Sequence, residues 1–173
     1  MKYDNWKIRG PGLPSLRREL EEAGLAPLCA AVLAARGIGG REEAARFLAD
    51  GPERFHDPFL LKDMDRAVAR VRRAIETGET VCVYGDYDVD GITATCLLTE
   101  ALALLGGKTV SYIPDRSEEG YGLNPRAVEG LAGQGVTLIV TVDCGITAAA
   151  EVDYARTLGV DVVVTDHHHC KTA

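Results

Sequence analysis

The 173-residue sequence predicts an α/β fold, a doubly wound and mostly parallel sheet that follows a helical N-terminal lead-in. In the second half of the chain, short apolar runs alternate with helical patterns, as in proteins built on a parallel sheet. These runs are continuous rather than alternating in polarity, which indicates strands covered on both faces. We therefore assign residues 1–78 to the helical lead-in and residues 79–173 to the sheet domain.

Four helical patterns make up the lead-in. Ser15 is expected to cap the first, SLRRELEEAG, which ends at Gly24. The next two are APLCAAVLAARG and REEAARFLAD, and a proline-containing connection, FHDPFLLKD, follows them. The fourth, DMDRAVARVRRAIETG, has its apolar residues on one face, with Asp63 as its cap and Gly78 as its stop. This helix is therefore expected to pack on the sheet.

Four strands and three helices are expected in the sheet domain. The strands are predicted at residues 80–84, 109–113, 137–142 and 160–165. One helix should run from about Thr93 to Leu105, and the others over PRAVEGLAGQG and TAAAEVDYARTLG. Short connections between these segments favour a doubly wound arrangement.

Composition favours a cytoplasmic protein without a membrane segment. No apolar run approaches the ~20 residues of a membrane helix, and no apolar stretch follows the N-terminal charges as in a signal peptide. The five cysteines include no CxxC pair, which indicates reduced thiols rather than a zinc cluster.

The net charge of −7 is concentrated in the second part of the chain. Residues 1–78 carry 14 Lys and Arg against 12 Asp and Glu, whereas residues 79–173 carry 5 against 14. Two bound divalent cations would offset four of these negative charges. The acidity is therefore compatible with a nucleic-acid substrate, but any broad basic surface must lie elsewhere.

Acids or histidines follow every predicted strand at its carboxyl end, the edge at which open parallel sheets bind ligands. In chain order they are Asp86, Asp88 and Asp90, then Asp115, then Asp143, and finally Asp166, His167, His168 and His169. Clustered carboxylates repel one another unless a cation neutralises them. Carboxylate oxygens with imidazole nitrogens suit Mn²⁺ or Mg²⁺, and several aspartates able to bridge suggest two ions ~3.5–4 Å apart.

Three segments carry this prediction, and each has a simpler alternative. The acids of GDYDVDGIT could instead form a turn that caps the next helix, although Gly91 would also let the backbone approach a ligand. The histidines of DHHH could have no function, but three in a row after a strand are hard to place in a core. In VDCGIT, Asp143 could be a helix cap, and Cys144 is expected to be a packed thiol.

Residues outside the acidic cluster could contact a substrate. Arg116 could bind a phosphate through its guanidinium, or pair with Glu118 or Glu119. Tyr121 could stack on a base or cover the sheet. A group near the N-terminus could touch a nucleic acid or form a solvated helix face: Trp6, Lys7, Arg9, Arg17 and Arg18.

Four segments, in this order, resemble the first four motifs of the DHH phosphoesterase superfamily: GDYDVDGIT, IPDRSEEGYGLN, TVDCGIT and TDHH. The residues within these motifs resemble those of bacterial single-strand-specific 5′→3′ DNA exonucleases. The same resemblance is seen in RGI (36–38), in DPFLLKDM (57–64) and in the spacing of Trp6 and Arg9. The resemblance covers nearly the whole chain.

The resemblance implies a role for each matching residue. It implies metal ligands at Asp86, Asp88, Asp143 and His167, and these residues with His168 form the implied catalytic set. His168 matches a histidine close to the scissile phosphate, Asp166 an acid that supports the histidines, and Arg116 a phosphate-binding residue. Asp90 stands where other members have an apolar residue, and we interpret it as supporting.

The implied activity is two-metal hydrolysis of single-stranded DNA from its 5′ end, in DNA repair and recombination. Single-stranded DNA is the implied substrate, and a single-strand-binding protein and a helicase are expected partners. The alternatives are a phosphodiesterase for short oligonucleotides or cyclic dinucleotides, a pyrophosphatase, or a non-catalytic binding fragment. A later-motif aspartate, a C-terminal domain and an oligonucleotide-binding fold of the family are not found in the sequence, so we expect a fragment of a longer protein.

Overall fold

The computed structural model describes residues 10–49, 51 and 55–170, which fall into two compact units, Met1–Leu60 and Leu61–Ala173. The division that we predict between residues 78 and 79 lies inside the second unit, after its first helix. The proposed contacts of Trp6, Lys7 and Arg9 lie outside the described residues.

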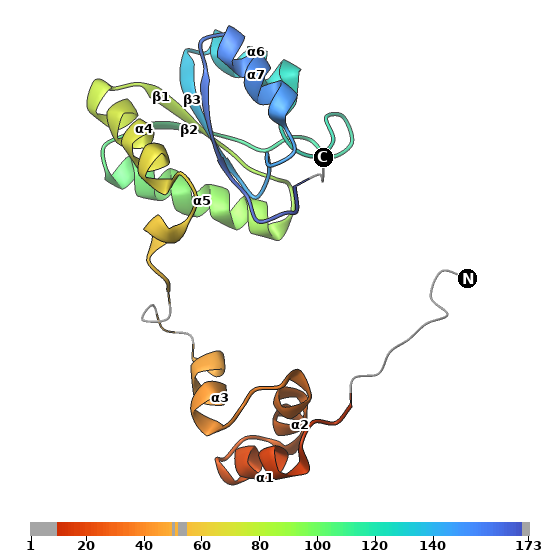
Figure 1. The fold of residues 1–173 in the computed structure, drawn as a ribbon. Helices are drawn as coiled ribbons and strands as arrows, with labels where there is room; N and C mark the ends of the chain where they lie inside the picture. Colours follow the sequence, from red (N-terminus) through yellow and green to blue (C-terminus); the bar gives the residue numbers. More distant parts are fainter. Residues whose placement is uncertain (1–9, 50, 52–54, 171–173) are drawn as a thin grey trace. The chain divides into compact units, whose positions relative to one another are not determined.

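The first unit contains three short helices, α1 (Pro14–Glu22), α2 (Pro27–Arg36) and α3 (Arg41–Leu48), followed by the 3₁₀ turn η2 (Pro58–Leu60) (Figure 1). Leu20, Ala30, Leu33 and Ala44 form its buried core. The predicted cap at Ser15 is wrong. Helix α1 begins at Pro14, because proline suits the first helical position, and its N-cap residue makes no side-chain cap.

The second unit is a four-stranded sheet with helices between its strands. Its elements are α4 (Met64–Thr77), β1 (Thr80–Tyr84), α5 (Val89–Leu104), β2 (Lys108–Tyr112), α6 (Pro125–Gly133), β3 (Val136–Val142), α7 (Ala149–Thr157) and β4 (Asp161–Thr165). The strand order is β2-β1-β3-β4, and every neighbouring pair is parallel. The predicted doubly wound parallel sheet is confirmed. Within the described residues, no helix is both long and apolar enough to cross a membrane.

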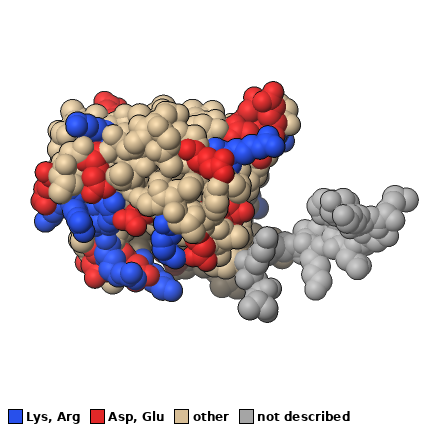
Figure 2. Space-filling model, turned by 90° about the horizontal axis from the view of Figure 1, so that it is seen from above, with Lys and Arg blue, Asp and Glu red and all other residues tan. Residues whose placement is uncertain are grey.

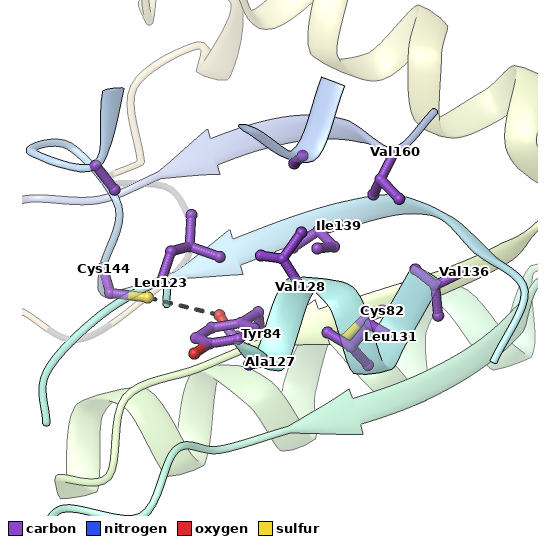
Figure 3. Packing of buried hydrophobic residues seen from close by; sticks show 12 residues of the cluster. Cys82, Tyr84, Leu123, Ala127, Val128, Leu131, Val136, Ile139, Cys144 and Val160 are labelled. Atoms are coloured by element: carbon purple, nitrogen blue, oxygen red, sulfur yellow. Dashed lines mark hydrogen bonds between the residues drawn. The ribbon is translucent and has the colours of Figure 1, made fainter. Parts of the chain in front are cut away.

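Helices cover both faces of the sheet, as the continuous apolar strands predicted (Figure 1). On one face, Val81 and Val83 pack with Ala74 of α4 and Leu102 of α5. On the other face, Cys82 and Tyr84 pack with residues of α6 and α7 (Figure 3). Alternate residues of β1 therefore belong to two cores, so this strand is buried between two layers of helices.

Cys144 belongs to the core on the α6 and α7 face. Its Sγ donates a hydrogen bond to the carbonyl of Tyr84 at 3.7 Å (Figure 3). Burial raises the pKa of the Cys144 thiol to about 12. The prediction of a packed thiol is confirmed.

Two predicted helix starts need correction. Helix α5 begins at Val89, four residues before the predicted start at Thr93, because Asp88 caps it. Asp63 precedes α4 as predicted, but it has a left-handed backbone and makes no side-chain cap.

Strand register brings three carboxyl ends to one edge. Tyr84 of β1 pairs with Thr141 of β3, and Val142 of β3 pairs with Thr165 of β4. The residues that follow these strands therefore emerge side by side.

Candidate metal centre

The turn after β1 places two aspartates at the start of α5. Oδ1 of Asp88 caps this helix, accepting hydrogen bonds from the N–H groups of Asp90 at 2.9 Å and Gly91 at 3.1 Å. The capping alternative is thus correct for one oxygen of Asp88. Asp86 is only 3% exposed. Gly91 lies against its backbone so closely that a Cβ would stand 2.5 Å from the Asp86 carbonyl oxygen, so glycine is required there.

The turn after β3 passes through a left-handed residue, Asp143, with φ of 61°. Its carbonyl accepts a hydrogen bond from the hydroxyl of Tyr121 at 3.0 Å. The carbonyl of Cys144 accepts one from Thr141 Oγ1 at 2.7 Å. The helix-cap alternative for Asp143 is wrong, since Ala148 is the N-cap residue of α7.

Asp166 links the end of β4 to the turn after β3. Its Oδ2 accepts a hydrogen bond from the N–H of Ile146 at 2.9 Å, and its Oδ1 accepts one from the N–H of His168 at 3.0 Å. The same Oδ1 lies 2.7 Å from His168 Nδ1. Because its side chain is only 1% exposed, Asp166 is placed to orient His168 rather than to meet solvent.

These turns create two groups of potential metal ligands that share one residue. Asp86, Asp88 and Asp143 form the first, and Asp143, His167 and His168 form the second. Within each group, one ligand atom from every member lies within 4.8 Å of the others. Asp143 is therefore placed to bridge two cations.

The donor atoms fit divalent cations such as Mn²⁺ or Mg²⁺. Oδ1 of Asp143 is buried and accepts no hydrogen bond from the residues that the structure describes, although His167 Nε2 lies 2.8 Å away. A buried carboxylate oxygen without a donor is costly, and a cation satisfies it. Carboxylates with a minority of imidazoles are ligands that manganese and magnesium accept.

Electrostatics at the site also favour a bound cation. Burial raises the pKa of Asp86 above its ordinary value, and the neighbouring charges of Asp88 and Asp143 raise it further. A hydrogen bond with Asp166 raises the pKa of His168. Burial would raise the pKa of Asp166, but hydrogen bonds from the N–H groups of His168 and Ile146 outweigh it and lower this pKa.

Other sequence candidates lie outside both groups of ligands. Asp90 is exposed in the first turn of α5, and His169 is exposed beyond the second group. Asp115 is not brought to the cluster. Its Oδ1 accepts hydrogen bonds from the N–H and the hydroxyl of Ser117, which closes a turn within its own loop.

The loop between β2 and α6 carries Arg116 and Tyr121. Glu119 organises it, accepting hydrogen bonds from the Tyr112 hydroxyl at 2.6 Å and from Asn124 Nδ2 at 2.9 Å. The guanidinium of Arg116 lies over the ring of Tyr87, 5.3 Å from its centroid. Within the described part of the chain Arg116 forms no ion pair, so the predicted alternatives at Glu118 and Glu119 are not found.

Tyr121 contributes more to the site than its sequence position indicated. Its hydroxyl contacts the Asp143 carbonyl at 3.0 Å and His168 Nδ1 at 3.1 Å, and the Tyr121 and His168 rings meet edge to face. Tyr121 is 48% exposed, so part of the residue still faces solvent. Sequence reasoning proposed the ring and missed the hydroxyl, because the contacts join residues 22 and 47 positions apart.

A family model described as "DHH family, N-terminal domain" matches residues 80–173, more than half of the chain. The chain belongs to the DHH family. The matched DHH region includes both groups of ligands and all four strands.

This DHH chain is similar to curated proteins and to a solved structure. It is 40% identical over 163 residues to the single-stranded-DNA-specific exonuclease RecJ of Bacillus subtilis, covering 94% of this chain and 21% of that protein. It is 39% identical over 158 residues to the RecJ of Escherichia coli, covering 88% and 27%. A crystal structure of RecJ from Thermus thermophilus in complex with Mn²⁺ matches with a TM-score of 0.66 and 33% identity, covering 94% and 22%. The chain thus spans about a fifth to a quarter of these relatives' lengths.

Proposed function

We propose that this chain is the metal-binding part of a single-strand-specific DNA exonuclease that hydrolyses phosphodiester bonds from the 5′ end. The observation that carries the proposal is the position of Asp143 in both groups of ligands. Similarity to proteins named as single-stranded-DNA-specific exonucleases supports the choice of substrate.

Four residues would hold two cations, Mn²⁺ or Mg²⁺. We assign Asp86 and Asp88 to one ion, His167 to the other, and Asp143 to both. When bound, a pair of divalent cations activates water and neutralises the charge that develops on a phosphoryl group. The buried Asp143 oxygen without a hydrogen-bond donor supports this assignment.

Side chains around the ligands would position the DNA. We assign His168 and Arg116 to the phosphate. The guanidinium of Arg116 donates hydrogen bonds to it, and His168 donates through Nε2 when its ring is protonated, because Nδ1 already lies against Asp166 and Tyr121. The exposed part of the Tyr121 ring would offer a surface on which a base can stack. Asp166 supports His168, and Asp90 has a lesser supporting role in the turn that holds Asp88.

Basic surface for a longer strand is expected elsewhere. On the face that Figure 2 presents, Lys and Arg gather mainly at one corner, with Asp and Glu between them. We propose that the whole protein works in the cytoplasm in DNA repair and recombination, with a single-strand-binding protein and a helicase as partners.

The test uses the whole natural protein, Mn²⁺ and a 30-nucleotide single strand labelled at one end. Early release of the 5′ label as a mononucleotide is expected, and loss of the 3′ label first would overturn the polarity. A dinucleotide provides the second arm. Faster hydrolysis of the dinucleotide would favour a small-substrate phosphodiesterase, and no hydrolysis of either would favour a binding module.

A further inference from the structure

The hydroxyl of Tyr121 joins two parts of the site that the sequence keeps apart. It comes from the loop between β2 and α6, and it reaches Asp143 after β3 and His168 after β4. The contact with Asp143 is to the backbone carbonyl, so it leaves the carboxylate of that residue available. Because the Tyr121 hydroxyl contacts two residues of the metal site, Tyr121 does more than cover the sheet.

The chemistry of these contacts fixes which group donates. A carbonyl oxygen only accepts, so the single proton of the Tyr121 hydroxyl must go to Asp143. The contact with His168 Nδ1 then requires the ring nitrogen to donate. Asp166 Oδ1 lies 2.7 Å from the same nitrogen and also only accepts, so the single hydrogen of Nδ1 is shared between Asp166 and the Tyr121 oxygen. In the neutral ring, Nδ1 therefore carries the hydrogen and Nε2 keeps its lone pair.

The Tyr121 hydroxyl also affects the backbone conformation of Asp143. A left-handed residue that is not glycine persists only where its surroundings hold it. The Tyr121 hydroxyl bonds the carbonyl of this residue, and Thr141 Oγ1 bonds the carbonyl of the next one. Both bonds maintain the turn that directs the Asp143 carboxylate into the two groups of ligands.

We infer that Tyr121 is a positioning residue of the metal site, whose hydroxyl holds the left-handed turn at Asp143 and, together with Asp166, keeps the hydrogen of the neutral His168 ring on Nδ1. The inference rests on the proposed function for its meaning in catalysis, but its effect on metal binding can be measured without DNA. Residues that support metal ligands in this way typically contribute ~10–100-fold in affinity.

The experiment compares Tyr121→Phe with Tyr154→Phe in Mn²⁺ titrations by calorimetry, using the whole natural protein. Tyr121→Phe keeps the ring and should weaken Mn²⁺ binding by about tenfold. Tyr154→Phe loses a hydroxyl bond to Glu129 on the surface of α6 and α7, and should bind Mn²⁺ like the original protein. Affinity within twofold of the original in Tyr121→Phe would overturn the inference.

Nuclease assays on the same variants separate this inference from the proposed function. Tyr121→Phe should need more Mn²⁺ for half-maximal rate, with an unchanged KM for DNA once Mn²⁺ is saturating, because the ring remains. If the original protein binds Mn²⁺ and leaves DNA intact, the proposed function fails and the titration still decides the inference.

A measurement on the original protein covers the case in which Tyr121→Phe does not fold. Nitrogen-15 shifts of the neutral His168 ring, in the metal-free protein, report which nitrogen carries the hydrogen. The hydrogen is expected on Nδ1. A hydrogen on Nε2 would contradict the donor assignment and overturn the inference.

Discussion

Asp143 combines a strained backbone with a buried carboxylate oxygen that accepts no hydrogen bond within the described part of the chain. The left-handed conformation costs most L-residues roughly 1–2 kcal/mol, although aspartate and asparagine adopt it more readily. The oxygen lies between the two groups of ligands, where a cation can satisfy it. Both features are unfavourable in the metal-free protein. Both serve to hold a metal when one binds, as is common for strain at functional sites.

Substitution of Asp143 separates the backbone from the carboxylate. Asp143→Asn tolerates the left-handed turn but loses the charge, so we expect a folded protein whose Mn²⁺ affinity falls more than ~100-fold. Asp143→Ala should reduce turnover by orders of magnitude and also lower the melting temperature, because alanine resists this conformation. Calorimetry and thermal unfolding measure the two effects. Mn²⁺ affinity in Asp143→Asn equal to that of an Asp153→Ala control, on the exposed surface of α7, would contradict the assignment.

At this scale, the sequence predicted which acids and histidines gather, but not how each is held. Asp86, Asp88 and Asp143 follow buried strands, and strand ends in a parallel sheet share an edge. The positive φ of Asp143 and the hydroxyl contacts of Tyr121 depend on neighbours distant in sequence, which no local pattern reports. Thr141 was missed for the same reason, since its hydroxyl oxygen also accepts a hydrogen bond from the N–H of Thr165, at 3.3 Å.

At the scale of elements, the junction of β1 and α5 depends on one close approach. A Cβ at residue 91 would lie 2.5 Å from the Asp86 carbonyl oxygen, which is backbone and cannot move aside cheaply. We expect Gly91→Ala to cost ~1–3 kcal/mol of unfolding free energy and to weaken Mn²⁺ binding, because Asp86 must shift. Gly130→Ala is the matched control. It lies in α6 with no atom near its Cβ and should be neutral or gain up to ~1 kcal/mol. Equal stability of the two variants in urea would refute the account.

The opposite end of the sheet is tied by an ion-pair network. Arg70 of α4 donates to Glu79 Oε2 at 2.7 Å and to Asp161 Oδ2 of β4 at 2.6 Å. Thr137 of β3 also donates to Glu79 Oε2, at 2.7 Å. This network joins α4 to the amino ends of three neighbouring strands, so it secures the sheet at the end away from the metal site.

The network predicts a pH-dependent stability. The hydrogen bond from Arg70, with that from Thr137, lowers the pKa of Glu79 from its ordinary 4.5 to about 2. A lowered folded-state pKa gives stability that is complete above pH 4.5 and is lost as pH falls toward 2. Glu79→Gln should cost ~1–2 kcal/mol at neutral pH and flatten this decline in urea unfolding of the metal-free protein. Asp153→Asn, which loses an exposed pair with Arg156, should change neither. An unaltered pH profile in Glu79→Gln would disprove the role of the network.

Helix boundaries were predicted less well than strands. Strand β1 was placed correctly at 80–84, because its apolar run is bounded by a stop glycine and an acidic turn. Helix α5 starts earlier than expected, since a capping aspartate decides its start and the motif was interpreted for its metal chemistry. Helix α1 begins at Pro14, one residue before the predicted cap Ser15, so Ser15 lies inside the helix.

For the whole molecule, the two compact units make different contributions. The parallel sheet with two covered faces could be predicted because its strands are short, apolar and regularly spaced. The extent of the units could not be predicted, because the packing of α4 on β1 puts a helix of the lead-in into the sheet unit.

All described candidate ligands belong to the unit Leu61–Ala173. Metal should therefore stabilise this unit and leave the three-helix unit unchanged.

Hydrogen exchange can measure this difference directly. A cation that binds only the folded state stabilises it by RT ln(1 + [L]/Kd), ~2.7 kcal/mol at 100 times Kd, which slows exchange through unfolding about 100-fold. We expect such slowing at amides of β1, β3 and β4, and none in α1–α3. Chelation should reverse the effect, and Asp143→Asn should lack it. Equal slowing in both units would mean that metal acts elsewhere or that the units unfold together, and no slowing would mean that the two groups of ligands do not hold the cation. A response confined to the sheet unit and absent in Asp143→Asn would locate the metal where the carboxyl ends of β1, β3 and β4 meet.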